Sequence, residues 1–212
     1  MEQKARQLII FLAGELQNKE HIREFIDRSD ADFYAADAGY KYAQEFGVEL
    51  KRVFGDFDSA EIPDATNLTV YPCEKDQTDS ELALDLAISD GYSSIWMIAP
   101  FGGRLDHTVA NIALLEKAKH SEVELKLYDG ENLAFLLEEG EHILPSGLRY
   151  ISFFPIDESA AVSLCNFKYP LKNKTIRRMI PLAISNEPAG EDPKITVHHG
   201  TVLCICIEQE AK

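Results

Sequence analysis

Residues 95–107 read IWMIAPFGGRLDH and combine an apolar run, a glycine turn and the start of a helical pattern. The run 95–99 is short and ends at Pro100, as expected for a strand that is covered on both faces of a parallel sheet. From 106 to 119 the apolar residues follow the longer spacing of a helix. This strand, turn and helix form the repeating unit of a doubly wound α/β fold.

The same alternation precedes this stretch. We expect further strands at 8–13, 33–36, 52–54 and 68–71, and further helices at 21–28, 38–46 and 79–89. Thr78 and Glu81 form a capping box at the start of the last of these helices. Segments 123–128 and 133–137 close this domain or lead out of it, and we assign Trp96 and Phe101 to its core.

The pattern changes near Gly147, where short β-rich runs broken by Pro, Asn and Gly begin. Runs at 150–154, 161–164, 180–184, 195–197 and 202–207 predict a small antiparallel β-sandwich. In the last run, Cys204 and Cys206 alternate with larger residues, so we expect both on one buried face of a strand. The charge divides at the same place, because the first 147 residues carry 13 basic and 29 acidic side chains.

The 212 residues carry a net charge of −15 and four cysteines. Such an acidic surface repels phosphate backbones and anionic lipids, so we expect no nucleic-acid or membrane partner. No apolar run approaches the roughly 18 residues of a membrane-spanning helix, and no signal peptide is evident at the start. The few cysteines form no Cys-x-x-Cys pair, and we expect a cytoplasmic protein without a disulfide framework.

Acidic side chains follow several of the predicted strands. They are Asp37 after the second strand, Asp56 and Asp58 after the third, Asp79 after the fourth and Asp106 after the fifth. The carboxyl ends of parallel strands lie at one edge of a sheet, so these acids are expected to converge. Two like charges about 4 Å apart repel by roughly 4 kcal/mol at an effective dielectric of 20, so the cluster needs a cation. Oxygen ligands favour Mg²⁺, which usually bridges carboxylates to substrate phosphates.

The residues around this cluster suit phosphate chemistry. Arg104 follows two glycines that let backbone amides approach a phosphoryl group, whose charge the guanidinium would meet. His107 and Asn111 lie one helical turn apart, so they share a face and touch either substrate or the adjoining loop. Each acid also has a structural interpretation: Asp106 as a helix cap, Asp79 as a complement to the helix dipole, and Asp37 as a turn former.

Five motifs carry a resemblance to a known family: GDFDS at 55–59, DQTD at 76–79, GGRLDH at 102–107 followed by Asn111, KYPL at 168–171 and SNE at 185–187. In this order, and over almost the whole chain, they resemble the thiamine pyrophosphokinase family. The resemblance implies an α/β catalytic domain at residues 1–140 that binds ATP and Mg²⁺, and a β-sandwich thiamine-binding domain at 141–212. It also implies a homodimer that transfers a diphosphate group from ATP to the hydroxyl of thiamine and releases AMP.

The resemblance assigns roles residue by residue. The implied metal ligands are Asp56, Asp58 and Asp79, and the implied catalytic groups are these three with Arg104 and Asp106. The implied substrate contacts are Asp37, Gln77, His107 and Asn111. Ser185 and Asn186 are implied to line the thiamine pocket at the subunit interface. Which of the three metal-binding aspartates would accept the hydroxyl proton stays open. Where many relatives have Asp-Gly-Gly after the second strand, this chain has Asp37-Ala38-Gly39, which restricts the backbone approach slightly.

Two other functions fit parts of the pattern. A Mg²⁺-dependent phosphohydrolase would use Asp56 as nucleophile and Asp58 as acid, although no basic residue is obviously placed to hold an aspartyl phosphate. A non-catalytic binder of a cationic small molecule would use the acids only as counter-charges, and it explains Arg104 poorly.

Overall fold

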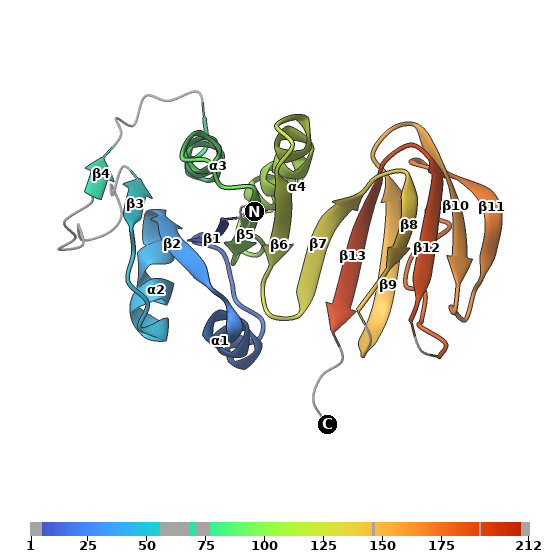
Figure 1. Cartoon of the computed structure of the whole chain (residues 1–212), viewed down its shortest axis with the longest axis horizontal. Helices are drawn as coiled ribbons and strands as arrows, with labels where there is room; N and C mark the ends of the chain where they lie inside the picture. The colour runs from blue at the N-terminus through green and yellow to red at the C-terminus, as the bar shows by residue number, and fades with distance from the viewer. Residues whose placement is uncertain (1–5, 56–67, 71–76, 146, 191, 209–212) are drawn as a thin grey trace, which may run out of the picture. The chain divides into compact units, whose positions relative to one another are not determined.

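The computed structural model describes residues 6–55, 68–70, 77–145, 147–190 and 192–208. Asp56 and Asp58, two of the expected metal ligands, lie outside these residues. The chain divides into two compact units, residues 1–130 and 131–212 (Figure 1).

The first unit contains a parallel sheet in the order β4-β3-β2-β1-β5-β6. Its strands are β1 (Gln7–Phe11), β2 (Ala31–Ala36), β3 (Arg52–Gly55), β4 (Leu68–Val70), β5 (Ser94–Ile98) and β6 (Glu124–Tyr128). The chain leaves β1 toward β2 on one side and later returns to β5 on the other side. The strand order therefore reverses between β1 and β5, which is where ligands bind in open α/β sheets.

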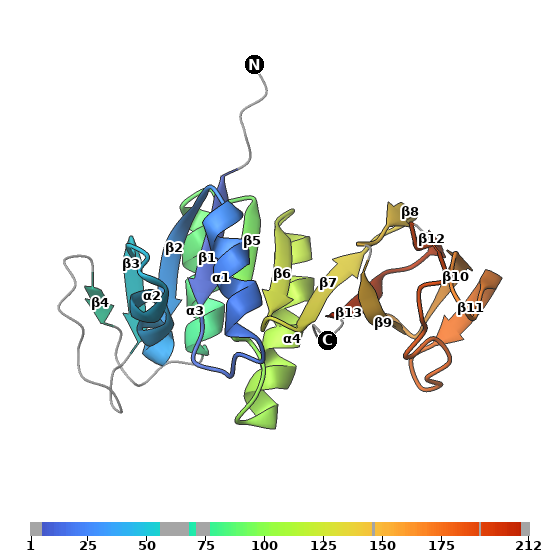
Figure 2. The ribbon, with the colours of Figure 1, turned by 90° about the horizontal axis from the view of Figure 1, so that it is seen from below.

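Helices cover both faces of this sheet. They are α1 (Lys19–Arg28), the short turn η1 (Asp37–Gly39) with α2 (Tyr40–Phe46), α3 (Asp79–Ser89) and α4 (Leu105–His120). Helices α1 and α2 lie on one face, and α3 and α4 lie on the other (Figures 1 and 2). Each expected strand and helix of this unit is present within two residues of its predicted bounds, and the doubly wound fold is confirmed.

Local sequence explains these elements. In β1, residues 8–11 are fully buried, as the continuous apolar run predicts. Asn18 caps α1 by accepting from the backbone N–H of Glu20 and His21, both at 3.1 Å. Thr78 caps α3 by accepting from the backbone N–H of Glu81 at 3.2 Å, as the capping box predicts.

Two aromatic residues assigned to the core are only partly buried. Trp96 in β5 is half-buried; its ring meets Phe25 of α1 at a centroid distance of 4.4 Å, and the Lys126 ammonium lies 5.0 Å from the ring centroid. The same ammonium pairs with the Glu124 carboxylate at 2.8 Å, so a charged pair rather than apolar core side chains lies at this ring. Phe101, in the loop after β5, is also half-buried.

The second unit contains two antiparallel sheets, with strand orders β7-β13-β9 and β11-β10-β12-β8. The strands are β7 (Asn132–Leu137), β8 (Gly140–Ile143), β9 (Leu148–Pro155), β10 (Ser159–Cys165), β11 (Leu171–Arg177), β12 (Lys194–His199) and β13 (Val202–Glu208). Both sheets contribute to one apolar core, which confirms the predicted sandwich. Cys204 and Cys206 are fully buried in it, as expected.

One strand of this unit was predicted wrongly. The apolar stretch 180–184 is not a strand, because Pro181 lacks an N–H and because Ile180 and Leu182 are 57% and 51% exposed. Isolated bridges join this part of the chain to its neighbours instead. Two strands were not predicted, β8 and β11, which are the edge strands of the four-stranded sheet. In β11 only Leu171 and Ile176 are apolar.

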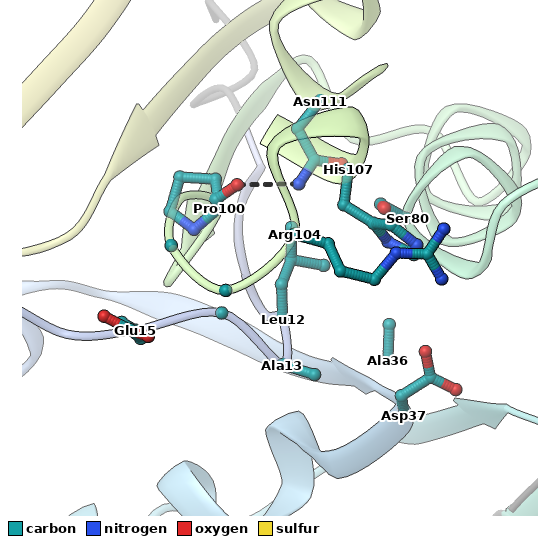
Figure 3. A pocket seen from close by; sticks show the side chains of 13 residues that line it. Leu12, Ala13, Glu15, Ala36, Asp37, Ser80, Pro100, Arg104, His107 and Asn111 are labelled. Carbon is teal, nitrogen blue, oxygen red and sulfur yellow. Dashed lines mark hydrogen bonds between the residues drawn. The ribbon is translucent and has the colours of Figure 1, made fainter. Parts of the chain in front are cut away.

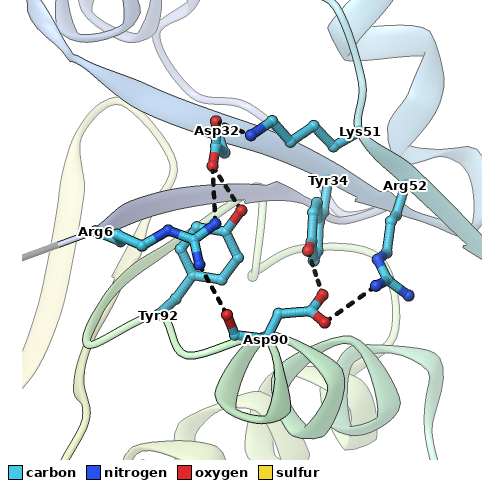
Figure 4. Close-up of polar contacts among 7 residues, drawn as sticks. All are labelled: Arg6, Asp32, Tyr34, Lys51, Arg52, Asp90 and Tyr92. Atoms are coloured by element: carbon cyan, nitrogen blue, oxygen red, sulfur yellow. Dashed lines mark hydrogen bonds and ion pairs between the residues drawn. The ribbon is translucent and has the colours of Figure 1, made fainter.

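A polar network ties the amino-terminal edge of the first sheet (Figure 4). Asp32 accepts from the Tyr92 hydroxyl at 2.6 Å and pairs with the Lys51 ammonium at 2.6 Å. Asp90 accepts from the Tyr34 hydroxyl at 2.5 Å and pairs with Arg52 at 3.0 Å. Burial would raise the pKa of Asp32, but the hydrogen bonds from Lys51 and Tyr92 outweigh it and lower that pKa. This edge lies opposite the ligand-binding edge and holds the loop before β5 to β2 and β3.

Candidate active site

A pocket of about 360 Å³ opens at the carboxyl edge of the first sheet (Figure 3). Three loops line it: residues 12–15 after β1, residues 36–37 at the end of β2, and residues 100 and 102–104 after β5. Ser80 of α3 and His107 and Asn111 of α4 complete the lining. The pocket therefore sits where the strand order reverses, as the fold predicts.

Close backbone contacts fix the loops around this pocket. A Cβ on Gly14 would lie 2.3 Å from the carbonyl oxygen of Phe101, so the loops after β1 and β5 touch directly. A Cβ on Gly39 would lie 2.1 Å from the carbonyl oxygen of Phe11. Gly39 is thus the glycine that the packing requires after β2, and Ala38 is tolerated in the same short turn.

Asp37 directly follows β2 and has a left-handed backbone (φ +49°), which Asp adopts more readily than most residues. A Cβ on Gly55 would come within 2.7 Å of the Asp37 carboxylate oxygen. The carboxylate therefore rests against the last residue of β3, from which the chain continues to Asp56. Of the strand-end acids that the structure describes, Asp37 lines the pocket, whereas Asp79 and Asp106 do not.

Arg104 and Asp106 form an exposed pair at the start of α4. The Arg104 guanidinium donates from Nε to Asp106 Oδ1 at 3.1 Å, and its Nη2 makes a second contact with the other carboxylate oxygen. The hydrogen bond from Arg104 lowers the pKa of Asp106 and raises the pKa of the guanidinium. Of these two residues, Arg104 lines the pocket and Asp106 does not. Asp106 orients the arginine and accepts from the His107 backbone N–H at 3.0 Å, while Arg104 occupies the helix-cap position.

His107 and Asn111 share one face of α4, and both line the pocket. Asn111 is 6% exposed, and its Nδ2 donates to the carbonyl oxygen of Pro100 at 2.8 Å (Figure 3). Its Oδ1 is buried and has no hydrogen-bond partner among the described residues. Asn111 thus anchors the loop that carries Arg104.

Asp79 and Gln77 lie beside the pocket and do not line it. Asp79 is half-buried in the first turn of α3, next to Ser80, which lines the pocket. Gln77 precedes α3 and is exposed, and its amide donates to the Asp85 carboxylate of α3 at 2.9 Å. No cluster of three or more metal-binding side chains occurs among the residues that the structure describes.

Ser185 and Asn186 belong to the second unit. Asn186 is buried, accepts from the Tyr169 backbone N–H at 3.1 Å and donates to the Tyr169 carbonyl oxygen at 2.8 Å. Its amide therefore fixes the loop at Tyr169. Ser185 is exposed, has a φ of +54°, and donates its backbone N–H to Ser152 Oγ at 2.9 Å.

Sequence reasoning missed two polar side chains of the pocket lining, Glu15 and Ser80. Glu15 lies in the loop after β1, at the same edge of the sheet as the other acids that follow strands, so the rule used for those acids also finds it. Ser80 gives no comparable signal, because serine is common in the first turn of helices.

A doubly wound α/β unit with a polar pocket at its switch point, followed by an antiparallel β-sandwich unit, defines a two-unit protein whose first unit has the architecture of nucleotide-binding domains. A family model described as thiamin pyrophosphokinase, catalytic domain, matches residues 24–127, and one described as thiamin pyrophosphokinase, vitamin B1 binding domain, matches 141–202.

Known proteins agree with this assignment. Thiamine pyrophosphokinase of Bacillus subtilis (strain 168) is 37% identical over 161 residues, which cover 71% of this chain and 75% of that protein. The crystal structure of thiamine pyrophosphokinase from Bacillus subtilis superimposes with a TM-score of 0.86 at 28% identity, over 96% of this chain and all of that one. The Geobacillus thermodenitrificans structure gives 0.81 at 30% identity, over 97% and 99%. The chain belongs to the thiamine pyrophosphokinase family and is an enzyme of the transferase class, as its motifs predict.

Among the described residues, no helix is both long and apolar enough to cross a membrane.

Proposed function

We propose that this enzyme transfers the diphosphate group of ATP to the hydroxyl of thiamine, forming thiamine diphosphate and AMP. The observation that carries the proposal is the pocket at the switch point, which is lined by Arg104 at the start of α4 and by Asp37, the acid that follows β2, in a chain of this family. A helix N-terminus and a guanidinium together suit a phosphate chain.

The residues of the first unit would divide the work. Arg104, held by Asp106, would stabilise the charge that develops as the thiamine oxygen attacks the β-phosphorus and the bond to the AMP oxygen breaks. Asp56, Asp58 and Asp79 would hold Mg²⁺, which neutralises phosphate charge when bound, and one of them would instead accept the hydroxyl proton. The described pocket offers the Asp37 carboxylate, an oxygen donor of the kind that suits such a hard cation.

The second unit would bind thiamine. The match of residues 141–202 to a vitamin B1 binding domain supports this role. We place Ser185 and Asn186 at the thiamine pocket, and we propose a homodimer in the cytoplasm. The exposed position of Ser185 and the rigid loop that Asn186 holds are consistent with a preformed wall.

One incubation tests the reaction. Protein with ATP, thiamine and Mg²⁺ should release AMP and thiamine diphosphate in equal amounts, and omission of Mg²⁺ should stop it. Free phosphate released from a monoester would indicate the phosphohydrolase instead. Thiamine binding without any product would indicate a non-catalytic binder.

A further inference from the structure

Glu15 is a pocket carboxylate to which the proposed reaction gives no specific role. It follows β1, and its backbone is held firmly: its N–H donates to the Phe101 carbonyl oxygen at 2.7 Å, and the Tyr42 hydroxyl donates to the Gly14 carbonyl oxygen at 2.8 Å. The matched catalytic-domain segment begins at residue 24, after Glu15.

The side chain of Glu15 is also positioned. It lies against Gly102, where an added Cβ would come within 2.7 Å of the Glu15 Cβ and 3.0 Å of its carboxyl carbon. Gly102 has a φ of +90°, which favours glycine, and the absence of a Cβ there leaves room for the Glu15 side chain. Glu15 is exposed, and within the described part of the chain no hydrogen bond or ion pair holds its carboxylate.

Glu15 and Asp37 occupy different ends of the pocket. Asp37 rests against the end of β3, whereas Glu15 rests against the loop after β5, and in the sheet β2 and β1 lie between those two strands. In Figure 3 the Arg104 guanidinium and the Asp37 carboxylate lie toward one end and Glu15 toward the other. A phosphate chain near Arg104 therefore leaves Glu15 to face an uncharged part of the nucleotide, since a carboxylate repels phosphate.

The uncharged part that suits a carboxylate is the ribose. Its two neighbouring hydroxyls are hydrogen-bond donors, and the two oxygens of one carboxylate can accept from both. We propose that Glu15 accepts hydrogen bonds from the 2′- and 3′-hydroxyls of the bound nucleotide and so selects ribonucleotides. This inference rests on the proposed use of ATP.

Calorimetry tests the contact without requiring turnover. We would measure the Kd of Mg²⁺-loaded ATP, 2′-deoxy-ATP and 3′-deoxy-ATP for the whole protein in the absence of thiamine. The wild-type protein should bind ATP about tenfold more tightly than at least one deoxy form, as expected for a hydrogen bond to a charged group. In Glu15→Ala this preference should fall to about twofold or less.

Glu116→Ala is the matched control, because Glu116 is an exposed glutamate on α4 outside the pocket. It should keep the wild-type preference. Equal wild-type binding of all three nucleotides, no binding of any of them, or a preference that survives in Glu15→Ala would overturn the proposal. A lack of thiamine diphosphate formation, with the binding preference intact, would instead refute the proposed reaction and leave the Glu15 contact standing.

Discussion

Asn111→Asp should destabilise the first unit in a manner that depends on pH. The substitution keeps the size of the side chain but replaces the Nδ2 donor, which bonds the Pro100 carbonyl oxygen at 2.8 Å, with a carboxylate oxygen. Two acceptors then face each other at a position that is 6% exposed. The lost hydrogen bond costs about 1 kcal/mol and the buried, unpaired carboxylate about 2 more, so we expect about 3 kcal/mol at pH 7.

The sign of the pH effect follows from burial. Desolvation raises the folded-state pKa of the introduced carboxyl above its unfolded value of about 3.9, so the cost is full above the folded pKa. As the pH falls toward the unfolded value, the protonated carboxyl donates to Pro100 and the cost shrinks. A difference from wild type of about 3 kcal/mol at pH 7 should fall to about 1 kcal/mol near pH 4.

The single tryptophan provides the assay. Trp96 lies in β5, in the same unit as Asn111, so its fluorescence during urea unfolding reports on that unit. With a slope of about 2 kcal/mol per molar urea, the midpoint should drop by about 1.5 M at pH 7. Asn18→Asp is the control, because Asn18 only accepts in its capping contacts and aspartate caps equally well. A cost at Asn111→Asp that is below 1 kcal/mol, or that is the same at both pH values, would refute the reasoning.

Three further outcomes follow from the described contacts. Gly39→Ala should cost about 2 kcal/mol or more by the same urea assay, because the added Cβ would lie 2.1 Å from the Phe11 carbonyl oxygen; a neutral result would mean that the turn after β2 can move away from β1. Asp32 has a lowered pKa, so its pairing with Lys51 stabilises the fold above its ordinary value of 3.8 and is lost as the pH falls through the lower folded value. Between pH 5 and pH 2.5, the free energy of unfolding should therefore fall by about 1 kcal/mol less in Asp32→Asn than in the wild type, as measured by urea unfolding at each pH. An equal fall in the two proteins would contradict this. Asp79→Asn should abolish thiamine diphosphate formation while the urea midpoint stays within about 0.5 M, and near-normal turnover would remove Asp79 from the site.

The parallel sheet was predictable because its signals are local. Strands buried on both faces show as apolar runs, and the rule that their carboxyl ends share an edge brought Asp37, Arg104, His107 and Asn111 to one pocket. The edge strand β11 was not predictable in this way, because a strand exposed on one side needs few apolar residues. The strand prediction at 180–184 was wrong for the opposite reason, because this stretch is apolar but largely exposed.

The roles of individual acids were harder to predict than their location. Neither Asp106 nor Gln77 lines the pocket, because their side chains bond Arg104 and Asp85. Spacing along the chain carries no information on such pairings. Glu15 was overlooked because it follows a strand without a flanking motif. Periodicity therefore located the edge of the sheet, whereas side-chain partners decide which groups face a ligand.

The left-handed backbone of Asp37 affects how this position should be probed. Aspartate and asparagine tolerate that conformation because their short polar side chains bond locally, whereas alanine pays about 1 kcal/mol in steric strain. An alanine scan at position 37 would therefore mix a distorted main chain with a missing charge. Asparagine keeps the dihedral angles and removes only the charge, which makes it the informative replacement for dissecting ligand binding there.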